Sequence, residues 1–217
     1  MKLRLVITGT DTSIGKTIFS AALANALNAY YWKPIQSGMD EETDSEIVQR
    51  IGGLPKHHII PEAWKLKKPI SPHLSAAIDG IEINPSKINV PIINHHIIIE
   101  GTGGLLVPIK NKYLFIDLIK RWNFPTILCA STSLGTINHC LLSLESLRNR
   151  NIKVLGIAFI GDPQPEVEKT ITNIGRVQYL GRLPKITPIE PDILHQNFQK
   201  YFAKSLLQEK FYEQFTK

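Results

Sequence analysis

The stretch GTDTSIGKT, residues 9–17, decides the fold of this chain. It follows a short apolar run and ends in a Gly-Lys-Thr triplet, with which phosphate-binding loops open a helix. The usual pattern, G-x-x-x-x-G-K-S/T, requires glycine at position 10, but Thr10 stands there and Gly9 lies one residue too early. Because the preceding strand and the final triplet are both in place, we expect the loop to bind phosphate.

The chemistry of the loop lies in its last three residues. Backbone N–H groups at a helix start face an anion, helped by an effective charge of about +0.5 from the helix dipole. Lys16 can reach the β- and γ-phosphates of a nucleotide, and the Thr17 hydroxyl can bind Mg²⁺. The alternative is a strand-to-helix turn in which Gly15 and its neighbours serve only as a cap.

The remaining pattern alternates strands and helices. Unbroken apolar runs, which are typical of strands covered on both faces, occupy 3–8, 96–101, 126–131, 154–160 and 177–181. Helical spacing of apolar residues occupies 16–28, 136–150 and 192–214. The alternation predicts an α/β fold of the P-loop NTPase type, with three α/β/α layers, a largely parallel sheet and one domain over residues 1–217. Residues 52–95, rich in Pro, Lys and His, are interpreted as a long excursion over the catalytic edge.

Composition excludes several classes of function. The net charge is +6 in 217 residues, but the basic residues are scattered, so we expect no nucleic-acid partner. No apolar run approaches 18 residues and no secretory leader is evident, which predicts a cytoplasmic protein without a membrane partner. Two cysteines are expected to be reduced structural thiols, and five histidines to be solvated or packed: Cys129, Cys140, His57, His58, His95, His96 and His195.

A metal-organising carboxylate is predicted at the end of the strand HHIIIE. Glu100 closes this apolar run, where a carboxylate would stand at the carboxyl edge of the sheet, and three glycines follow within four residues. Mg²⁺ prefers oxygen ligands, often one or two carboxylates beside phosphate and water. The alternative is a glutamate that only marks the strand end.

Six motifs in a fixed order carry a resemblance to a known family. They are GTDTSIGKT (9–17), YWKPIQSG (31–38), TDSEIVQR (43–50), SPH (71–73), IEGTGG (99–104) and LGTINH (134–139), with LGRLP (180–184) near the end. In this order the chain strongly resembles the dethiobiotin synthetases, including the early glycine of the loop. The resemblance implies an ATP- and Mg²⁺-dependent cyclo-ligase of biotin biosynthesis that joins 7,8-diaminononanoate and CO₂.

The resemblance assigns roles to matching residues. Lys16 would hold phosphate and carbamate, and Lys33 would neutralise the developing mixed anhydride, so both are expected to be catalytic. Thr12 and Ser37 would hydrogen-bond the diamine or carbamate, although both are also common turn residues. The nucleotide would contact a larger set: Asp11, Thr12, Ser13, Ile14, Gly15, Lys16, Thr17, Glu100, Gly161, Asp162 and Pro184.

Two further roles follow from the same resemblance. Thr17, Asp44 and Glu100 would organise Mg²⁺, although Asp44 also suits the first turn of a helix, where an acid complements the dipole. The far carboxylate of the diamine would bind a helix start of the other subunit, at Gly135, Ile137 and Asn138. This implies a homodimer, whereas simple capping by Ser133 or Thr136 would use the same N–H groups.

The sequence departs from the family at two positions. The family commonly reads adenine with an Asn-Asp pair, but this chain has Gly161 before Asp162, so we expect weaker discrimination among nucleoside triphosphates. Ser13 stands where the family often has an acid, and its consequence stays open.

Two other classes of protein have a related loop. Septum-positioning and plasmid-partition switch ATPases carry a second loop lysine five residues before the first, where this chain has Asp11. A corrinoid amidotransferase-type synthetase shares the loop, but it usually comes with a fused glutaminase domain for which 217 residues leave no room.

Overall fold

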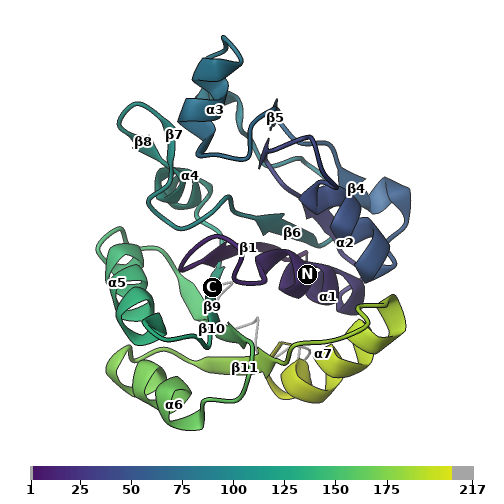
Figure 1. Ribbon diagram of the computed structural model, residues 1–217, viewed down its shortest axis with the longest axis vertical. Coiled ribbons are helices and arrows are strands. Elements are labelled where there is room, and N and C mark those ends of the chain that lie inside the picture. The colour runs from purple at the N-terminus through teal and green to yellow at the C-terminus, as the bar shows by residue number, and fades with distance from the viewer. Residues whose placement is uncertain (1, 207–217) are drawn as a thin grey trace.

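A computed structural model describes residues 2–206 and contains one seven-stranded parallel sheet (Figure 1). In spatial order its strands are β11 (Tyr179–Leu183), β10 (Val154–Ile160), β9 (Thr126–Ser131), β1 (Arg4–Gly9), β6 (Ile97–Glu100), β2 (Tyr30–Trp32) and β4 (Ile59–Ile60). The chain leaves β1 for β2 on one side and reaches β9 on the other. The sheet therefore changes direction of winding at β1, and the carboxyl ends of its strands form a binding edge there.

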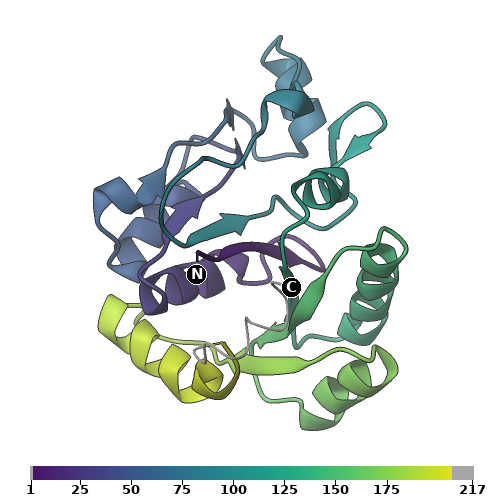
Figure 2. The same ribbon diagram turned by 180° about the vertical axis from the view of Figure 1, so that it is seen from behind.

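Helices cover both faces of the sheet (Figures 1 and 2). One face is covered by α1 (Lys16–Ala26), α2 (Asp44–Gly52) and α7 (Pro191–Leu206), which share an apolar core with the strands. The other face is covered by α4 (Phe115–Trp122), α5 (Thr136–Arg148) and α6 (Pro165–Ile174), which pack in two further clusters. The three-layer α/β/α fold is thus confirmed.

Smaller elements gather beyond the β6 and β2 side of the sheet, at the top of Figure 1. They are the parallel pair β3 (Ile35–Ser37) and β5 (Trp64–Leu66), the hairpin β7 (Pro108–Lys110) and β8 (Tyr113–Leu114), the helix α3 (Pro72–Ile78), and the 3₁₀ turns η1 (Lys56–His58) and η2 (Pro85–Lys87). The predicted excursion over 52–95 contains η1, β5, α3 and η2 and also supplies the edge strand β4.

The predicted elements are largely confirmed. Strands at 126–131 and 154–160 match residue for residue, and those at 3–8 and 96–101 match within one residue at each end. The last strand begins and ends two residues later than predicted. The predicted helix at 192–214 is α7 as far as Leu206, while its remaining part, with the apolar Phe211, lies outside the described residues.

The cysteines and the lengths of the helices can be described over residues 2–206. Cys129 and Cys140 are buried and free of disulfides, and burial raises the pKa of the Cys140 thiol to about 11. Over residues 2–206, no helix combines the length and the apolar character that crossing a membrane requires.

Candidate active site

The loop between β1 and α1 explains the irregular glycine. A Cβ atom at Gly9 would lie 2.6 Å from Cδ1 of Ile14 and 2.9 Å from Cδ of Lys16, so a side chain there would collide with both. A side chain there would force the side chains of Ile14 and Lys16 to shift. The early glycine thus suits the close packing of this loop.

The start of α1 is open to an anion. Its N-cap residue is Gly15, which has no side chain to cap the helix, and no acidic residue lies in the first turn. By contrast, α2 begins with a complete capping box, in which Thr43 and Glu46 satisfy each other's backbone N–H groups. The orphan N–H groups of α1 therefore suit a phosphate, whereas those of α2 are partly used.

Lys16 is the first residue of α1 and is 6% exposed. Its Nζ donates a hydrogen bond to the backbone oxygen of Asp11 at 2.5 Å, across the loop. Burial lowers the pKa of Lys16, although the carboxylate of Glu100 acts in the opposite direction. The Asp11 carboxylate is exposed and accepts from the Thr12 backbone N–H at 2.7 Å. The amine of Lys16 is therefore held over the loop.

A buried charge cluster lies beside the loop. Lys33 Nζ is 2.6 Å from Asp44 Oδ2 and 3.0 Å from Glu100 Oε1. Burial acts to lower the pKa of Lys33, but Glu100 and Asp44 outweigh it, so this pKa is raised. Burial acts to raise the pKa of Asp44, but Lys33 outweighs it, so that pKa is lowered. The Lys33 ammonium and the Asp44 carboxylate are therefore charged at neutral pH.

Thr17 joins the two carboxylates. Its Oγ1 lies 3.0 Å from Asp44 Oδ1 and 2.9 Å from Glu100 Oε1. A hydroxyl has one hydrogen and can donate to one of these oxygens at a time, so the other contact brings two lone pairs together. A cation in this neighbourhood would relieve that contact. Three hard oxygen donors of this kind fit Mg²⁺, which takes phosphate and water as further ligands.

The protein alone supplies few metal ligands. Over the described part of the chain, no group of three or more His, Cys, Asp and Glu side chains is placed to hold a metal ion. With only Asp44 and Glu100 as carboxylates, a metal here would depend on the nucleotide for further ligands. The site therefore suits a metal that arrives with a phosphate chain.

Nine of the predicted site residues line one cleft of about 700 Å³. They are Thr12, Ser13, Gly15, Lys16, Thr17, Lys33, Ser37, Asp44 and Glu100. The Oγ of Ser37 is buried there without a hydrogen-bond partner, which leaves it available to a ligand. Ser13 has a left-handed φ of 51° and an exposed side chain.

Several cleft residues were not predicted. They come from three parts of the chain: β3, α2 and the acidic loop between them, the segment 52–95 where it returns to the cleft, and the turn after β6. They are Gln36, Gly38, Asp40, Glu41, Glu42, Ile47, Pro69, Ile70, Ser71, Pro72, Thr102, Gly103 and Val107. The motif at 71–73 was the one sequence signal for this return. Tyr31 was also missed; its hydroxyl donates to Glu100 Oε2 at 3.0 Å, and burial raises its pKa.

The predicted base-binding residues lie at the ends of β10 and β11. Asp162 pairs with Lys185 at 2.8 Å, next to Pro184. A Cβ at Gly161 would lie 2.5 Å from Thr132 Oγ1, and the φ of Gly161 is 132°. Both observations exclude an asparagine at position 161 unless its surroundings rearrange. The glycine at position 161 therefore leaves room for the side chain of Thr132.

The predicted carboxylate site lies at the start of α5, outside the cleft lining. The N-cap Gly135 has φ 92° and the helix start has no side-chain cap, so the capping alternative at Ser133 or Thr136 is wrong. Instead, Thr136 Oγ1 donates to the Ser131 backbone oxygen at 2.6 Å. Ile137 and Asn138 follow in the first turn, and the preceding Leu134 is fully exposed.

Comparison with known proteins identifies the family. A family model described as an AAA domain matches residues 3–192. The chain is 56% identical over 202 residues to the ATP-dependent dethiobiotin synthetase BioD of Brucella anthropi, covering 93% of this chain and 95% of that protein. It is 55% identical, with the same coverage, to the protein of that name from Brucella melitensis. The chain belongs to the dethiobiotin synthetase family.

Solved structures agree on the fold. The septum site-determining protein MinD from Pyrococcus horikoshii, complexed with Mg-ADP, has a TM-score of 0.55 at 13% identity and covers 97% of this chain and 93% of its own. A ParA family ATPase from Chlorobium tepidum has a TM-score of 0.53 at 13% identity and covers 98% and 96%. At this identity the likeness shows the P-loop fold that the synthetase shares with switch ATPases, and no shared function.

Proposed function

We propose that this protein is an ATP-dependent dethiobiotin synthetase, a ligase that closes a cyclic urea from 7,8-diaminononanoate and CO₂. The observation that carries the proposal is the buried Lys33, held by Asp44 and Glu100 beside an open phosphate loop. Together with Lys16 and a bound Mg²⁺, Lys33 would bring positive charge to the cleft, which is what a carbamate next to a triphosphate requires. The relatives' high identity supports the same reaction.

The chemistry runs in three steps. One amine of the diamine attacks CO₂, loses a proton to solvent and becomes a carbamate. A carbamate oxygen then attacks the γ-phosphorus of ATP and releases ADP, which leaves a carbamic-phosphoric mixed anhydride. The second amine attacks the carbamoyl carbon and gives up a proton, the bond from that carbon to the phosphate oxygen breaks, and phosphate leaves with the proton as the ring closes. Lys33 and Lys16 balance the charge on the carbamate and phosphate oxygens.

The remaining residues are proposed to bind and orient the reactants. Asp11, Ser13, Ile14 and Gly15 would contribute loop contacts to the nucleotide, while Thr12 and Ser37 would hydrogen-bond the diamine or carbamate. The buried Ser37 hydroxyl without a partner supports the second role. When bound, Mg²⁺ would neutralise phosphate charge, and Thr17, Asp44 and Glu100 are the residues that would hold it.

We propose that the protein forms a homodimer, in which the second subunit binds the far carboxylate of the diamine. The uncapped start of α5, at Gly135, Ile137 and Asn138, offers N–H groups to a carboxylate. It lies outside the cleft lining, and the adjacent Leu134 is fully exposed, as expected for a residue that a second subunit covers. We further propose that the protein works in the cytoplasm as one domain, without nucleic acid.

Base discrimination is proposed to be weak. At the base end, Gly161 has no side chain, and Asp162 is paired with Lys185. A pocket without a dedicated hydrogen bond to its substrate discriminates by only about 100-fold, against about 10⁴- to 10⁵-fold for a pocket built around such a bond. We expect kcat/KM for GTP, CTP and UTP to fall within about 100-fold of that for ATP, measured by phosphate release. A larger ATP preference would show that another group reads the base.

Mass spectrometry of the product tests the proposed activity. The purified protein is mixed with 7,8-diaminononanoate, bicarbonate, Mg²⁺ and ATP, and a product with the mass of dethiobiotin is expected together with one ADP per ring closed. Isotopically labelled bicarbonate should place its carbon in the urea. A folded protein that binds ATP but yields no such product would contradict the proposal.

A further inference from the structure

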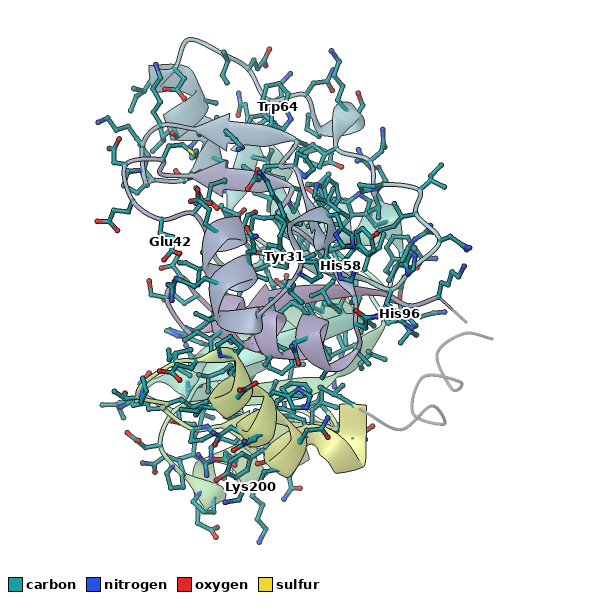
Figure 3. The ribbon with its side chains drawn as sticks, turned by 90° about the vertical axis from the view of Figure 1, so that its right-hand side faces the viewer. Tyr31, Glu42, His58, Trp64, His96 and Lys200 are labelled. Carbon is teal, nitrogen blue, oxygen red and sulfur yellow. The ribbon has the colours of Figure 1, made fainter. Side chains whose placement is uncertain are left out.

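Tyr31 carries a hydroxyl group although it lies in an apolar core. It lies in the middle of β2, is 0% exposed and belongs to the core shared with α1, α2 and α7. Figure 3 labels it inside the molecule, between Glu42 and His58. A phenylalanine would fill almost the same volume without a hydroxyl that must be satisfied, so the polar atom needs an explanation.

The register of the sheet explains where the hydroxyl goes. Tyr31 pairs with Ile98 of the parallel neighbour β6, and side chains two residues apart share a face, so Glu100 lies on the same face as Tyr31. The phenol leans toward the carboxyl edge and donates to Glu100 Oε2 at 3.0 Å. Glu100 is itself 0% exposed, so no water competes freely for that oxygen.

The two oxygens of Glu100 therefore have different partners. Oε1 faces Thr17 at 2.9 Å and Lys33 at 3.0 Å, while Oε2 accepts from Tyr31. Without the phenol, Oε2 would be buried and unsatisfied, and rotation of the carboxylate would let either oxygen approach Lys33. The donor on one side thus fixes which oxygen faces the phosphate loop.

We propose that Tyr31 is a positioning residue, whose hydroxyl holds Glu100 so that Oε1 stays directed at Thr17 and the proposed Mg²⁺ site. Groups that hydrogen-bond a metal ligand fix its orientation, and their loss typically weakens metal affinity 10- to 100-fold. The inference rests on the proposed role of Glu100 toward Mg²⁺. It adds Tyr31, which opens the motif YWKPIQSG but to which the sequence analysis assigns no role.

The test compares Tyr31→Phe with a matched control, Tyr30→Phe, which removes a hydroxyl from the neighbouring residue on the opposite face of β2. Calorimetry measures ATP affinity with Mg²⁺ and with a chelator, and thermal unfolding is followed in parallel. In Tyr31→Phe we expect the Mg²⁺-dependent gain in ATP affinity to fall about 10-fold, with affinity in chelator unchanged. Tyr30→Phe should match the wild type in both.

The outcomes separate the inference from the proposed function. A lower melting temperature in Tyr31→Phe with a wild-type Mg²⁺ gain would mean that the hydroxyl serves only the fold, which overturns the inference. Glu100→Gln serves as the reference for the metal role. If Glu100→Gln loses the gain and Tyr31→Phe keeps it, the inference alone is wrong. If Glu100→Gln keeps the gain, the proposed metal role of Glu100 fails, and the inference fails with it.

Discussion

The two edges of the parallel sheet both hold titratable side chains, but they hold them in opposite ways. At the carboxyl edge, Lys33 is buried between Asp44 and Glu100. At the amino edge, aromatic and histidine rings pack on one another, and Tyr30 stacks on His58 with ring centroids 4.4 Å apart. Figure 3 shows His58 and His96 to the right of Tyr31, whereas the cleft residue Glu42 lies to its left.

The difference teaches how to interpret a buried polar group. The charged groups of the carboxyl edge raise or lower one another's pKa values and surround a cleft, which is typical of a functional site. At the amino edge, burial lowers the pKa of His58 and of His96, so both favour the neutral ring. Charge is kept where a ligand is expected and removed where the rings only pack.

Lys33→Ala should have the largest effect. It removes the one ammonium between two carboxylates, so we expect turnover to fall about 100- to 1,000-fold, as for loss of a group that stabilises transition-state charge. ATP affinity should stay near the wild-type value, because we propose that Lys16 and the α1 start hold the phosphates. Product formation and calorimetric ATP binding measure the two effects, with the exposed Lys56→Ala as control.

Stability must be followed in the same variant. Two buried carboxylates without a cation repel each other, so the melting temperature of Lys33→Ala should drop, and assays belong well below it. Equal losses of ATP affinity and turnover in the folded variant would instead make Lys33 a nucleotide ligand or a structural residue.

Asp44→Asn separates two interpretations of one residue. Asp44 is the first residue of α2, where any acid complements the dipole, and it also contacts Lys33 and Thr17. Loss of a dipole interaction costs only about 0.3–1 kcal/mol. If Asp44 holds Mg²⁺, the Mg²⁺ concentration needed for half-maximal turnover should rise about 10-fold or more. The exposed Glu166→Gln, in the first turn of α6, controls for a general helix effect.

Much of the fold could be predicted because its central strands are unbroken apolar runs. β1, β9 and β10 are nearly completely buried, so both faces of each strand select apolar residues. β2 has only three residues, too few for a periodic signal, and was missed. α4 was also missed, although Phe115, Ile119 and Trp122 recur at helical spacing. α6, with ten residues, was missed as well.

The site residues also divide into those that a local sequence pattern predicts and those that depend on contacts between distant segments. Loop residues such as Lys16 and Thr17 could be predicted because their spacing is fixed by backbone geometry along the chain. The contact between Tyr31 and Glu100 joins residues 69 positions apart and depends on strand register, which no local pattern encodes. The agreement of Gly161 with Thr132 is of the same kind, since it depends on two adjacent strand ends.

The amino edge allows the mildest test, through pH. His96 Nδ1 accepts a hydrogen bond from the Leu3 backbone N–H at 2.9 Å, which requires an unprotonated nitrogen. Because burial lowers the folded-state pKa of His96 below its ordinary value of 6.5, the unfolded chain takes up the proton first. The free energy of unfolding should therefore fall as pH decreases from 6.5 through the folded-state pKa.

His96→Asn keeps an acceptor near the same place but cannot be protonated, so its unfolding should depend less on pH. Between pH 7.5 and 5.5, the free energy of unfolding of the wild type should fall by less than about 1 kcal/mol more than that of His96→Asn. The effect is small because His96 is only half-buried and solvent screens its charge. Urea unfolding at both pH values measures it, with the exposed His139→Asn as control. Turnover at pH 7.5 should be unchanged, since these rings lie away from the cleft. A loss of turnover in His96→Asn would mean that the two edges of the sheet are coupled, which would contradict the independence of the amino edge from the cleft.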